Sequence, residues 1–310
     1  MQLKNKDLVG LEGVSAEEIA HILDSAKSMK DYLKQGVKKM PQLQNKSIVT
    51  LFYENSTRTK MSFDLAGKYL GASMSAISAS SSSIQKGETL LDTGRTLEAM
   101  GVDIVIMRHP MSGAPELLGR NIDARVINAG DGMHEHPTQA LLDMYTMQEK
   151  LGKIKGLNVV IIGDILHSRV ARSNIHGLQT MGANVTLCSP ATLMPMEIEK
   201  TGVRVTYDLK NALKDADVVM GLRLQLERQK NGLLPSLREY NELFGVTREN
   251  IKYAKPGALI MHPGPVNRGV EMDTDIIDHD RSVITEQVTN GVAIRMALLY
   301  LMTRKKEETE

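Results

Sequence analysis

The stretch LFYENSTRTKMSF, residues 51–63, shows the structural unit that recurs along this chain. It opens with an apolar run typical of buried strands, and this run stops at hydroxyl groups clustered around Arg58. A helical pattern begins at once, because Met61, Leu65 and Tyr69 follow one another at intervals of four residues. The stretch therefore predicts a buried strand that passes directly into a helix, with polar side chains at the junction.

The same alternation continues on both sides of this stretch. The apolar run that opens the stretch is the end of SIVTLF (47–52). Further runs suited to buried strands are VDIVIM (102–107), ARVINA (124–129), NVVIIGD (158–164), NVTLCSP (184–190), ADVVMG (216–221) and ALIMHP (258–263). Amphipathic segments at 16–33, 138–152 and 290–302 predict helices. Strands that alternate with helices predict parallel sheets covered by helices on both faces.

The chain is long enough for two cores. Its 310 residues exceed the size of a typical single core, and the strand–helix pattern occurs once on each side of the helix predicted at 138–152. We therefore predict an α/β protein of two doubly wound, Rossmann-like domains with parallel sheets.

The charge balance limits the possible binding partners, and the cysteine content indicates the compartment. Lys and Arg number 38 against 37 Asp and Glu, so the near balance leaves no footprint for nucleic acid or an anionic membrane. The single cysteine, Cys188, suits a reducing compartment. The start MQLKNKDLVG lacks a signal-peptide pattern, and no apolar run approaches the ~18 residues of a membrane span. We expect a cytoplasmic protein with no nucleic-acid or membrane partner.

Polar loops follow six of the predicted strands. They are ENSTRT, RHP, GDGMHEHPTQ, GDILHSR, LRLQ and HPGPVNRG, in chain order. Ligands of open parallel sheets bind beyond the carboxyl ends of the strands, so this shared placement predicts the ligand sites.

The STRT sequence allows two interpretations. One is an ordinary hydroxyl cap at a helix start, with a surface arginine. The other is a phosphate site, because a helix N-terminus attracts anions and the Arg58 guanidinium matches phosphate geometry. Three hydroxyls around one arginine after a buried strand favour phosphate, and the chain lacks the glycine-rich P-loop pattern.

The remaining loops add cations and hydrogen-bond donors. His134 and His136 could ligate a metal, but no third ligand is evident, so we favour a hydrogen bond from His136 into the cleft, beside Gln139. The serine-rich segment 73–88 is either a flexible linker or a mobile active-site loop. Arg169 and Arg172 both lie at a predicted helix start, and one of the two is a candidate for a structural role.

No activated nucleophile or cofactor motif is present. Cys188 lies in an apolar strand pattern, and G-x-S-x-G and G-x-G-x-x-G are both absent. We therefore expect no metal, no nicotinamide and no other organic cofactor. The arginines, hydroxyls, histidine and glutamine suit direct group transfer between two anionic substrates, with catalysis by positioning and electrostatic stabilisation.

The motifs STRT, RHP, HPTQ, GD…HSR, RxQ and HPGPVNRG match, in order and spacing, the aspartate/ornithine carbamoyltransferase family. The resemblance covers essentially the whole chain. HPGP at 262–265 and the absence of an SMG loop make it similar to the aspartate branch, because the ornithine enzymes typically carry HCLP and SMG. The resemblance implies transfer of the carbamoyl group of carbamoyl phosphate to L-aspartate, an early step of pyrimidine synthesis.

The resemblance also implies a domain plan and an assembly. Residues 1–137, completed by a C-terminal helix at 291–310, would form the carbamoyl-phosphate-binding domain. A helix at 138–152 would join it to an aspartate-binding domain at 153–290. The chains would form a homotrimer, with or without separate regulatory chains.

Individual roles follow by position in the matched motifs. Phosphate would be held by Ser56, Thr57, Arg58 and Thr59. The carbamoyl oxygen would be polarised by Thr59, Arg108 and His136, and the carbamoyl amide held by Gln139, Gly264 and Pro265. Aspartate would be held by Arg169, Arg223 and Gln225. Ser82 and Lys86 would enter the site from a neighbouring subunit, where Lys86 is also a catalytic and aspartate-binding residue; which serine of 80–83 contacts substrate stays open.

Two alternatives remain at this point. A carbamoyltransferase for ornithine or a modified ornithine would need acidic partners where Arg223 stands. A non-catalytic phosphate-binding or nucleotide-binding module would explain STRT alone, but it would not explain Arg169, Arg223 and Gln225.

Overall fold

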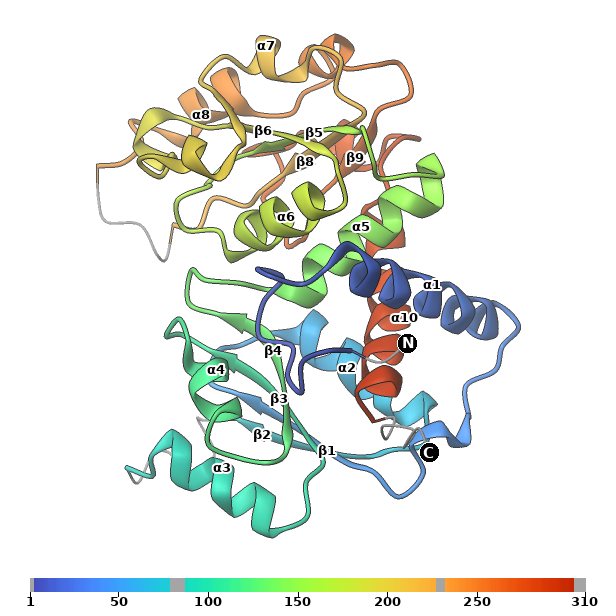
Figure 1. The fold of residues 1–310 in the computed structure, drawn as a ribbon. Helices are drawn as coiled ribbons and strands as arrows, with labels where there is room; N and C mark the ends of the chain where they lie inside the picture. Colours follow the sequence, from blue (N-terminus) through green and yellow to red (C-terminus); the bar gives the residue numbers. More distant parts are fainter. Residues whose placement is uncertain (1–2, 79–86, 227–231, 304–310) are drawn as a thin grey trace. The chain divides into compact units, whose positions relative to one another are not determined.

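The computed structural model describes residues 3–78, 87–226 and 232–303 (Figure 1). It divides into two compact units, of which the second is Asp143–Gln287 and the first comprises the chain through Leu142 and again from Val288. The boundaries between the units fall within two helices, α5 (Pro137–Leu151) and α10 (Ile284–Thr303). Each unit contains its own sheet, as the repeated strand–helix pattern predicts.

The first unit is built on a parallel sheet of four strands in the order β2-β1-β3-β4. Their bounds are β1 Ser47–Phe52, β2 Ser73–Ser78, β3 Ile104–His109 and β4 Arg125–Asp131. The helices are α1 Ala16–Lys34, α2 Thr57–Tyr69, α3 Leu90–Ala99 and α4 Ala114–Gly119, with the first part of α5 and most of α10.

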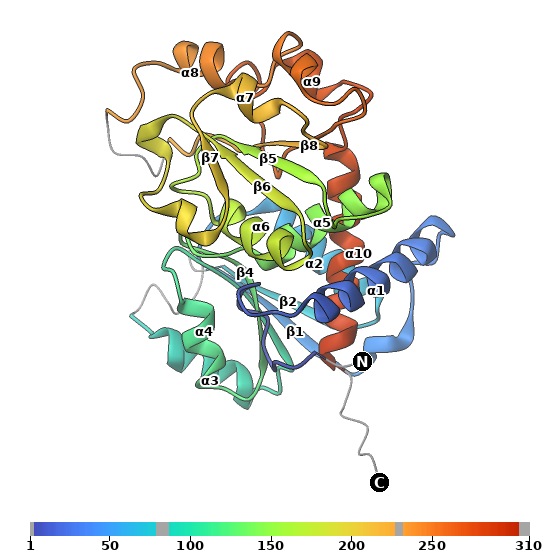
Figure 2. The same cartoon turned by 45° about the horizontal axis from the view of Figure 1, so that its top comes forward.

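Alternating side chains of this sheet bury opposite faces. One face packs against α3 and α4, in a cluster that includes Leu51, Met107, Leu97 and Leu118. Figures 1 and 2 show α2 and α10 on the other face. Helices on both faces of a parallel sheet define the doubly wound arrangement expected from the sequence.

The second unit has a parallel sheet of five strands in the order β7-β6-β5-β8-β9. The strands are β5 Asn158–Ile162, β6 Asn184–Cys188, β7 Arg204–Thr206, β8 Val218–Gly221 and β9 Leu259–Met261. Helices α6 (Arg169–Thr180) and α7 (Leu209–Leu213) lie on opposite faces, and α8 (Leu237–Phe244) and α9 (Thr274–Ile277) pack on the α7 side (Figure 2). This unit is also doubly wound.

The strand order locates one crevice in each sheet. In the first unit the chain crosses from β2 over β1 to β3, so the direction of winding reverses between β1 and β3. In the second unit the reversal falls between β5 and β8. Ligands of open α/β sheets bind outside the carboxyl ends of the strands at such a reversal. The polar loops after β1, β3, β5 and β8 are therefore the ones placed for ligand binding.

Three elements differ from the sequence-based expectation, the first being the short strand β7, which no predicted apolar run marked. Ser73–Ser78, in the serine-rich segment, forms β2, which pairs along its whole length with β1. It is an edge strand and largely exposed, so it needs no apolar run. The final helix begins at Ile284, six residues before the start expected at residue 290.

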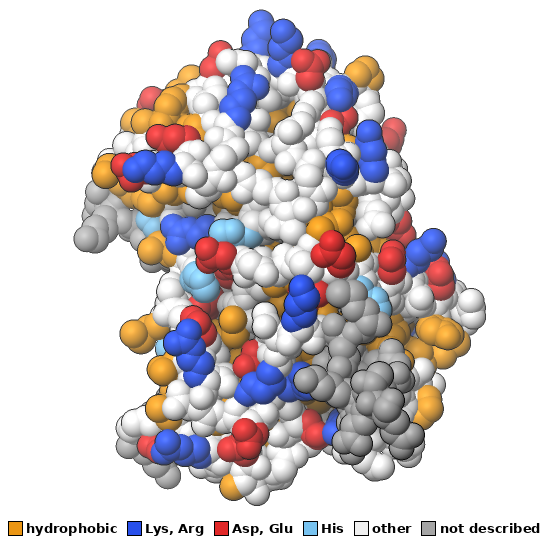
Figure 3. Space-filling view, viewed as in Figure 1, with side chains coloured by type: hydrophobic (Ala, Val, Ile, Leu, Met, Phe, Trp, Pro, Cys, Tyr) orange, Lys and Arg blue, Asp and Glu red, His pale blue; other side chains and the backbone are white. Residues whose placement is uncertain are grey.

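Figure 3 shows acidic and basic side chains intermixed over the face in view, as the near balance of charge predicts. No helix among residues 3–78, 87–226 and 232–303 combines the length and apolar character needed to cross a membrane.

Candidate active-site residues

The first turn of α2 lies directly after β1 and presents an open N-terminus. Ser56 is the N-cap residue, with extended backbone, but its side chain makes no capping hydrogen bond within the described part of the chain. In five other described helices the N-cap side chain accepts a backbone N–H, namely Ser15, Thr89, Ser168, Asp208 and Ser236, whereas the N-caps of the short helices α4 and α9 do not. At α2 the backbone donors and the Ser56 hydroxyl thus remain available for an anion.

The side chains around this N-terminus fit the same purpose. Thr57 and Arg58 are exposed at the first turn, whereas Thr59 is buried. An exposed guanidinium beside uncapped backbone N–H groups combines a planar donor pair with the positive end of the helix dipole. This combination is suited to a phosphate group.

Arg108 lies on the strand across the reversal from this helix start. It stands opposite Phe52 in the register of β1 and β3. Its Nε donates to Glu54 Oε2 at 3.3 Å, and its NH1 donates to the carbonyl of Ala129 at 3.4 Å. The Arg108 side chain is half-buried, so its charge acts in a medium less polar than water.

His136 and Gln139 are buried at the start of α5. Their exposed fractions are 5% and 8%. The backbone N–H of Gln139 donates to the His136 carbonyl at 3.0 Å. Both residues thus occupy fixed positions beyond the end of β4, as the HPTQ motif predicts.

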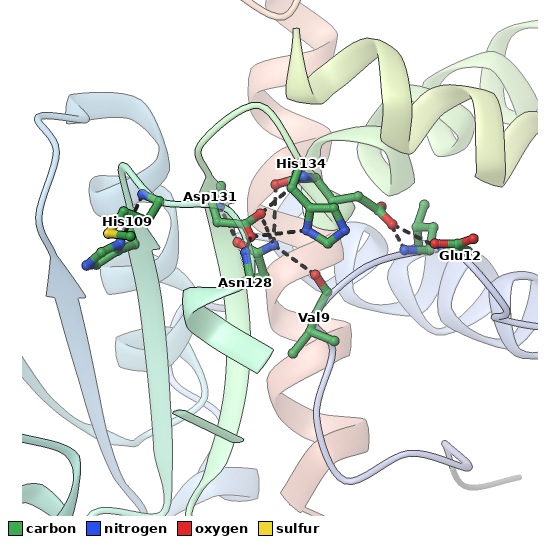
Figure 4. Close-up of polar contacts among 11 residues, drawn as sticks. Val9, Glu12, His109, Asn128, Asp131 and His134 are labelled. Carbon is green, nitrogen blue, oxygen red and sulfur yellow. Dashed lines mark hydrogen bonds and ion pairs between the residues drawn. The ribbon is translucent and has the colours of Figure 1, made fainter. Parts of the chain in front are cut away.

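A buried polar network holds the loop that leads to His136 (Figure 4). Asp131 accepts hydrogen bonds from the Asn128 side chain at 2.7 Å and the Glu135 amide at 3.1 Å. The Glu135 carboxylate in turn accepts the backbone amides of Leu11 and Glu12. The network fixes the β4–α5 loop to the N-terminal segment, and its members were not predicted from the sequence.

His134 belongs to this network. Its Nδ1 lies 3.1 Å from Asp131 Oδ2, and its side chain is partly exposed. Across the described ranges, no three His, Cys, Asp or Glu side chains come together as ligands of a metal ion would.

In the second unit, the ends of β5 and β8 approach closely. Gly163 has φ +132°, and a Cβ at this position would lie 2.6 Å from the Leu222 carbonyl. Because only glycine fits both this backbone and this approach, the two loops that follow can meet.

Asp164 joins those loops. Its carboxylate is fully buried and accepts His167 Nδ1 at 2.8 Å and the Gln225 backbone amide at 3.3 Å. The Gln225 side chain donates to the His167 carbonyl at 3.0 Å, so Gln225 bridges the loops. The two loops that this bridge joins lead to the two arginines: Arg169 is the first residue of α6, and Arg223 lies two residues after β8. Asp164 was not predicted as a site residue, although GD directly after an apolar strand is a signal for one.

Arg172, which the sequence alone did not distinguish from Arg169, contacts the loop before its own helix. Its NH2 donates to the Leu166 carbonyl at 3.4 Å, and burial lowers the pKa of its guanidinium.

The loop after β9 is held by a histidine at its start. His262 Nδ1 accepts the Gly264 amide at 2.8 Å, so its Nε2 carries the hydrogen and faces Glu271 Oε1 at 3.4 Å. The Gly264–Pro265 bond is cis.

The structure therefore places each described candidate at the end of a strand or the start of a helix. Seven of them lie in the first unit: Ser56, Thr57, Arg58, Thr59, Arg108, His136 and Gln139. Five lie in the second: Arg169, Arg223, Gln225, Gly264 and Pro265. Ser82 and Lys86 lie outside the described residues.

Two parallel α/β sheets, each with cationic groups at its reversal of strand order, define a two-domain protein that binds anionic ligands. Two family models match the chain, the carbamoyl-phosphate binding domain of aspartate/ornithine carbamoyltransferase over residues 6–149 and its aspartate/ornithine binding domain over residues 155–302. The chain belongs to the aspartate/ornithine carbamoyltransferase family.

Individual relatives agree with this assignment. The chain is 65% identical over 305 residues to an aspartate carbamoyltransferase catalytic subunit of Ruminiclostridium cellulolyticum, covering 98% of this chain and 97% of that one. A subunit of the same name from Acetivibrio thermocellus is 63% identical, with 98% of both chains covered.

Solved structures show the same fold. Aspartate transcarbamoylase from Trypanosoma cruzi, in complex with carbamoyl phosphate and aspartate, matches with a TM-score of 0.87 and 32% identity, over 96% of this chain and 97% of that one. Ornithine carbamoyltransferase from Pyrococcus furiosus matches with a TM-score of 0.86 and 32% identity, over 97% and 98%. The fold alone therefore does not distinguish the two acceptors.

Proposed function

We propose that the chain transfers the carbamoyl group of carbamoyl phosphate to the amino group of L-aspartate, which gives N-carbamoyl-L-aspartate and phosphate. The observation that carries the proposal is the α2 N-terminus with its uncapped Ser56, exposed Arg58 and neighbouring Arg108, at the reversal of the first sheet. The relatives named above support the choice of acceptor.

In the first unit, Ser56, Thr57, Arg58 and Thr59 bind the phosphate of carbamoyl phosphate. Thr59, Arg108 and His136 donate hydrogen bonds to the carbamoyl oxygen, and Gln139 holds the carbamoyl amide. The open helix terminus and the side chains fixed beyond β3 and β4 support these roles.

In the second unit, Arg169 and Arg223 bind the two carboxylates of aspartate. Gln225 and Asp164 keep the loops that carry these arginines in register, which their hydrogen bonds support. Gly264 and the carbonyl of Pro265 add contacts to the carbamoyl amide. Arginines suit a dicarboxylate and would repel the cationic tail of ornithine.

The reaction needs positioning and charge stabilisation more than an activated group. The neutral amine of aspartate attacks the carbamoyl carbon and forms a tetrahedral oxyanion, which Thr59, Arg108 and His136 stabilise. The C–O bond to phosphate then breaks, and phosphate leaves while bound to Arg58 and takes the amine proton. No step requires a metal or an organic cofactor.

The proposed assembly is a cytoplasmic homotrimer of catalytic chains, with or without separate regulatory chains. Ser82 and Lys86 would act in the site of a neighbouring subunit. The family membership supports this arrangement. Co-refolding of inactive Arg58→Ala and Lys86→Ala chains tests it, because random mixing in a closed ring should restore about a quarter of the sites.

The function itself is tested with purified protein and carbonyl-labelled carbamoyl phosphate. Label should pass into N-carbamoyl-L-aspartate only when aspartate is present, with one phosphate released for each product molecule. Release of phosphate without transfer, or binding of phosphate without turnover, would contradict the proposal and favour a binding module.

A further inference from the structure

Helix α10 carries one cation in the middle of a buried surface. Its side chains from residue 293 onward are almost all buried and apolar: Ala293, Ile294, Met296, Ala297, Leu298, Leu299, Leu301 and Met302. Arg295 lies within this run, and only 3% of it is exposed. Burial of a guanidinium is unfavourable before its interactions are counted, so packing alone does not explain an arginine here.

The Arg295 guanidinium contacts two other helices of the first unit. NH1 donates to the Ser62 hydroxyl of α2 at 3.0 Å, and NH2 donates to the Thr138 hydroxyl of α5 at 3.4 Å. NH1 also donates to the Gly291 carbonyl at 3.0 Å, and the Phe63 ring centroid lies 5.0 Å from the guanidinium carbon. The planar fork thus joins α2, α5 and α10.

Both contacts lie within one helical turn of the proposed substrate-binding residues. Ser62 follows Arg58 by four residues on α2, which places it one turn further along the same helix. Thr138 lies between His136 and Gln139 in the sequence. The distance between the phosphate-binding turn and the carbamoyl-binding turn therefore depends on a bridge through Arg295.

The local backbone leaves room for this bridge. A Cβ at Gly291 would lie 2.6 Å from Arg295 NH1 and 3.2 Å from Leu142 Cδ2. A side chain at Gly291 would thus push the guanidinium away from Ser62. Gly291 is therefore needed for Arg295, one turn later, to reach Ser62.

We propose that Arg295 is a positioning residue for carbamoyl phosphate. It sets the separation and orientation of the α2 and α5 N-termini, so that the phosphate and carbamoyl contacts form together. The inference rests on the proposed function and assigns a role to a residue that does not touch the substrate. Misplacement of such contacts by about 1 Å is enough to lower a rate by about 10²-fold.

The test compares Arg295→Met and Arg295→Lys with wild type. Methionine fills the space without charge, and lysine keeps the charge without the fork that spans two helices. We expect both variants to lose about 10²-fold in kcat/KM for carbamoyl phosphate and to bind inorganic phosphate more weakly. The KM for aspartate should change less than about threefold, because Arg169, Arg223 and Asp164 are unaltered.

Stability separates positioning from a structural role. Arg295→Met removes the desolvation cost of the guanidinium but also leaves the Ser62 and Thr138 hydroxyls without their donor, so it should unfold at a urea concentration close to that of wild type. Leu299→Ala, a buried position on the same helix, is the control: it should lower stability while kcat/KM stays near wild type.

Smaller deletions keep the test valid if Arg295→Met does not fold. Ser62→Ala and Thr138→Val each remove one end of the bridge and should each weaken carbamoyl phosphate binding selectively. Loss of stability with unchanged substrate kinetics in these variants would overturn the inference. Wild-type protein without transferase activity would instead overturn the proposed function, and phosphate binding by the Arg295 variants would still decide the positioning role.

Discussion

Arg108 and Glu54 form an ion pair at the ends of adjacent parallel strands, with Nε and Oε2 3.3 Å apart. The pair is partly buried on both sides, and the second anchor of Arg108 is the Ala129 carbonyl. Two anchors, one in the loop after β1 and one on β4, hold the guanidinium before substrate binds. The donor that the proposed mechanism directs at the carbamoyl oxygen is therefore preorganised.

Glu54→Gln should lower kcat about tenfold. The neutral amide keeps the shape of the side chain but loses a charge-assisted hydrogen bond, which contributes about 1.5–3 kcal/mol. Binding of inorganic phosphate should change little, because Arg58 and the α2 N-terminus are intact. Steady-state kinetics with a phosphate titration decide the point, and an unchanged kcat would mean that Glu54 does not orient Arg108.

Arg58→Ala should lower kcat by about 10²–10³-fold, the typical cost of removing one preorganised donor. Arg58→Lys should not restore the rate, because an ammonium lacks the planar fork. Both variants should keep wild-type stability, since Arg58 is exposed. A near-normal kcat in Arg58→Lys would argue against a phosphate site at the α2 N-terminus.

Asp164→Asn should impair the acceptor side selectively. Asparagine cannot accept from both His167 and Gln225 with its two terminal atoms, so the loops bearing Arg169 and Arg223 lose their link. We expect kcat/KM for aspartate to fall at least tenfold, with phosphate binding within about twofold of wild type. A loss of phosphate affinity as large as the loss for aspartate would contradict a role confined to the second unit.

Cys188 should make the protein less stable in alkali. Burial raises the pKa of its thiol to about 12, whereas the pKa of a thiol in an unfolded chain is about 8.5. Above that lower value the unfolded chain releases a proton that the folded chain keeps. Stability therefore falls as pH rises, by about 1.4 kcal/mol per pH unit for this group.

The matched control for this effect is Cys188→Ala. Its urea-unfolding free energy should fall about 2 kcal/mol less than that of wild type between pH 8 and pH 10, because it lacks this titration. Cavity formation shifts the variant equally at both pH values, so it cancels in the comparison. Identical pH dependence in the two proteins would show that the thiol is not kept protonated by the fold.

The sequence predicted where most candidate residues lie in the fold, because strand ends and helix starts are local features. Apolar runs marked β1, β3, β4, β5, β6, β8 and β9, and the parallel topology then brought the polar loops after them to one edge of each sheet. Arg58 and Arg108 stand out by their place in that pattern, whereas Arg169 was distinguished from Arg172 only by the family resemblance.

The supporting residues were harder to predict, because their partners are distant in sequence. Glu135 accepts amides at residues 11 and 12, and Asp164 accepts the amide of Gln225, so only the folded chain shows these pairs. β2 was missed because an exposed edge strand can be rich in serine. Arg295 did leave a signal, namely a charged residue inside NGVAIRMALLYLM, but the sequence did not show its partners.

Acceptor choice is the central claim, and direct competition tests it. Carbamoyl phosphate is offered to wild-type protein with equal concentrations of L-aspartate and L-ornithine, and both carbamoylated products are quantified by mass spectrometry. The product ratio gives the ratio of kcat/KM values. We expect N-carbamoyl-L-aspartate to exceed citrulline by at least about 10²-fold, because Arg169 and Arg223 attract a dicarboxylate and repel a cationic tail. An excess of citrulline, or equal amounts of both products, would contradict the account.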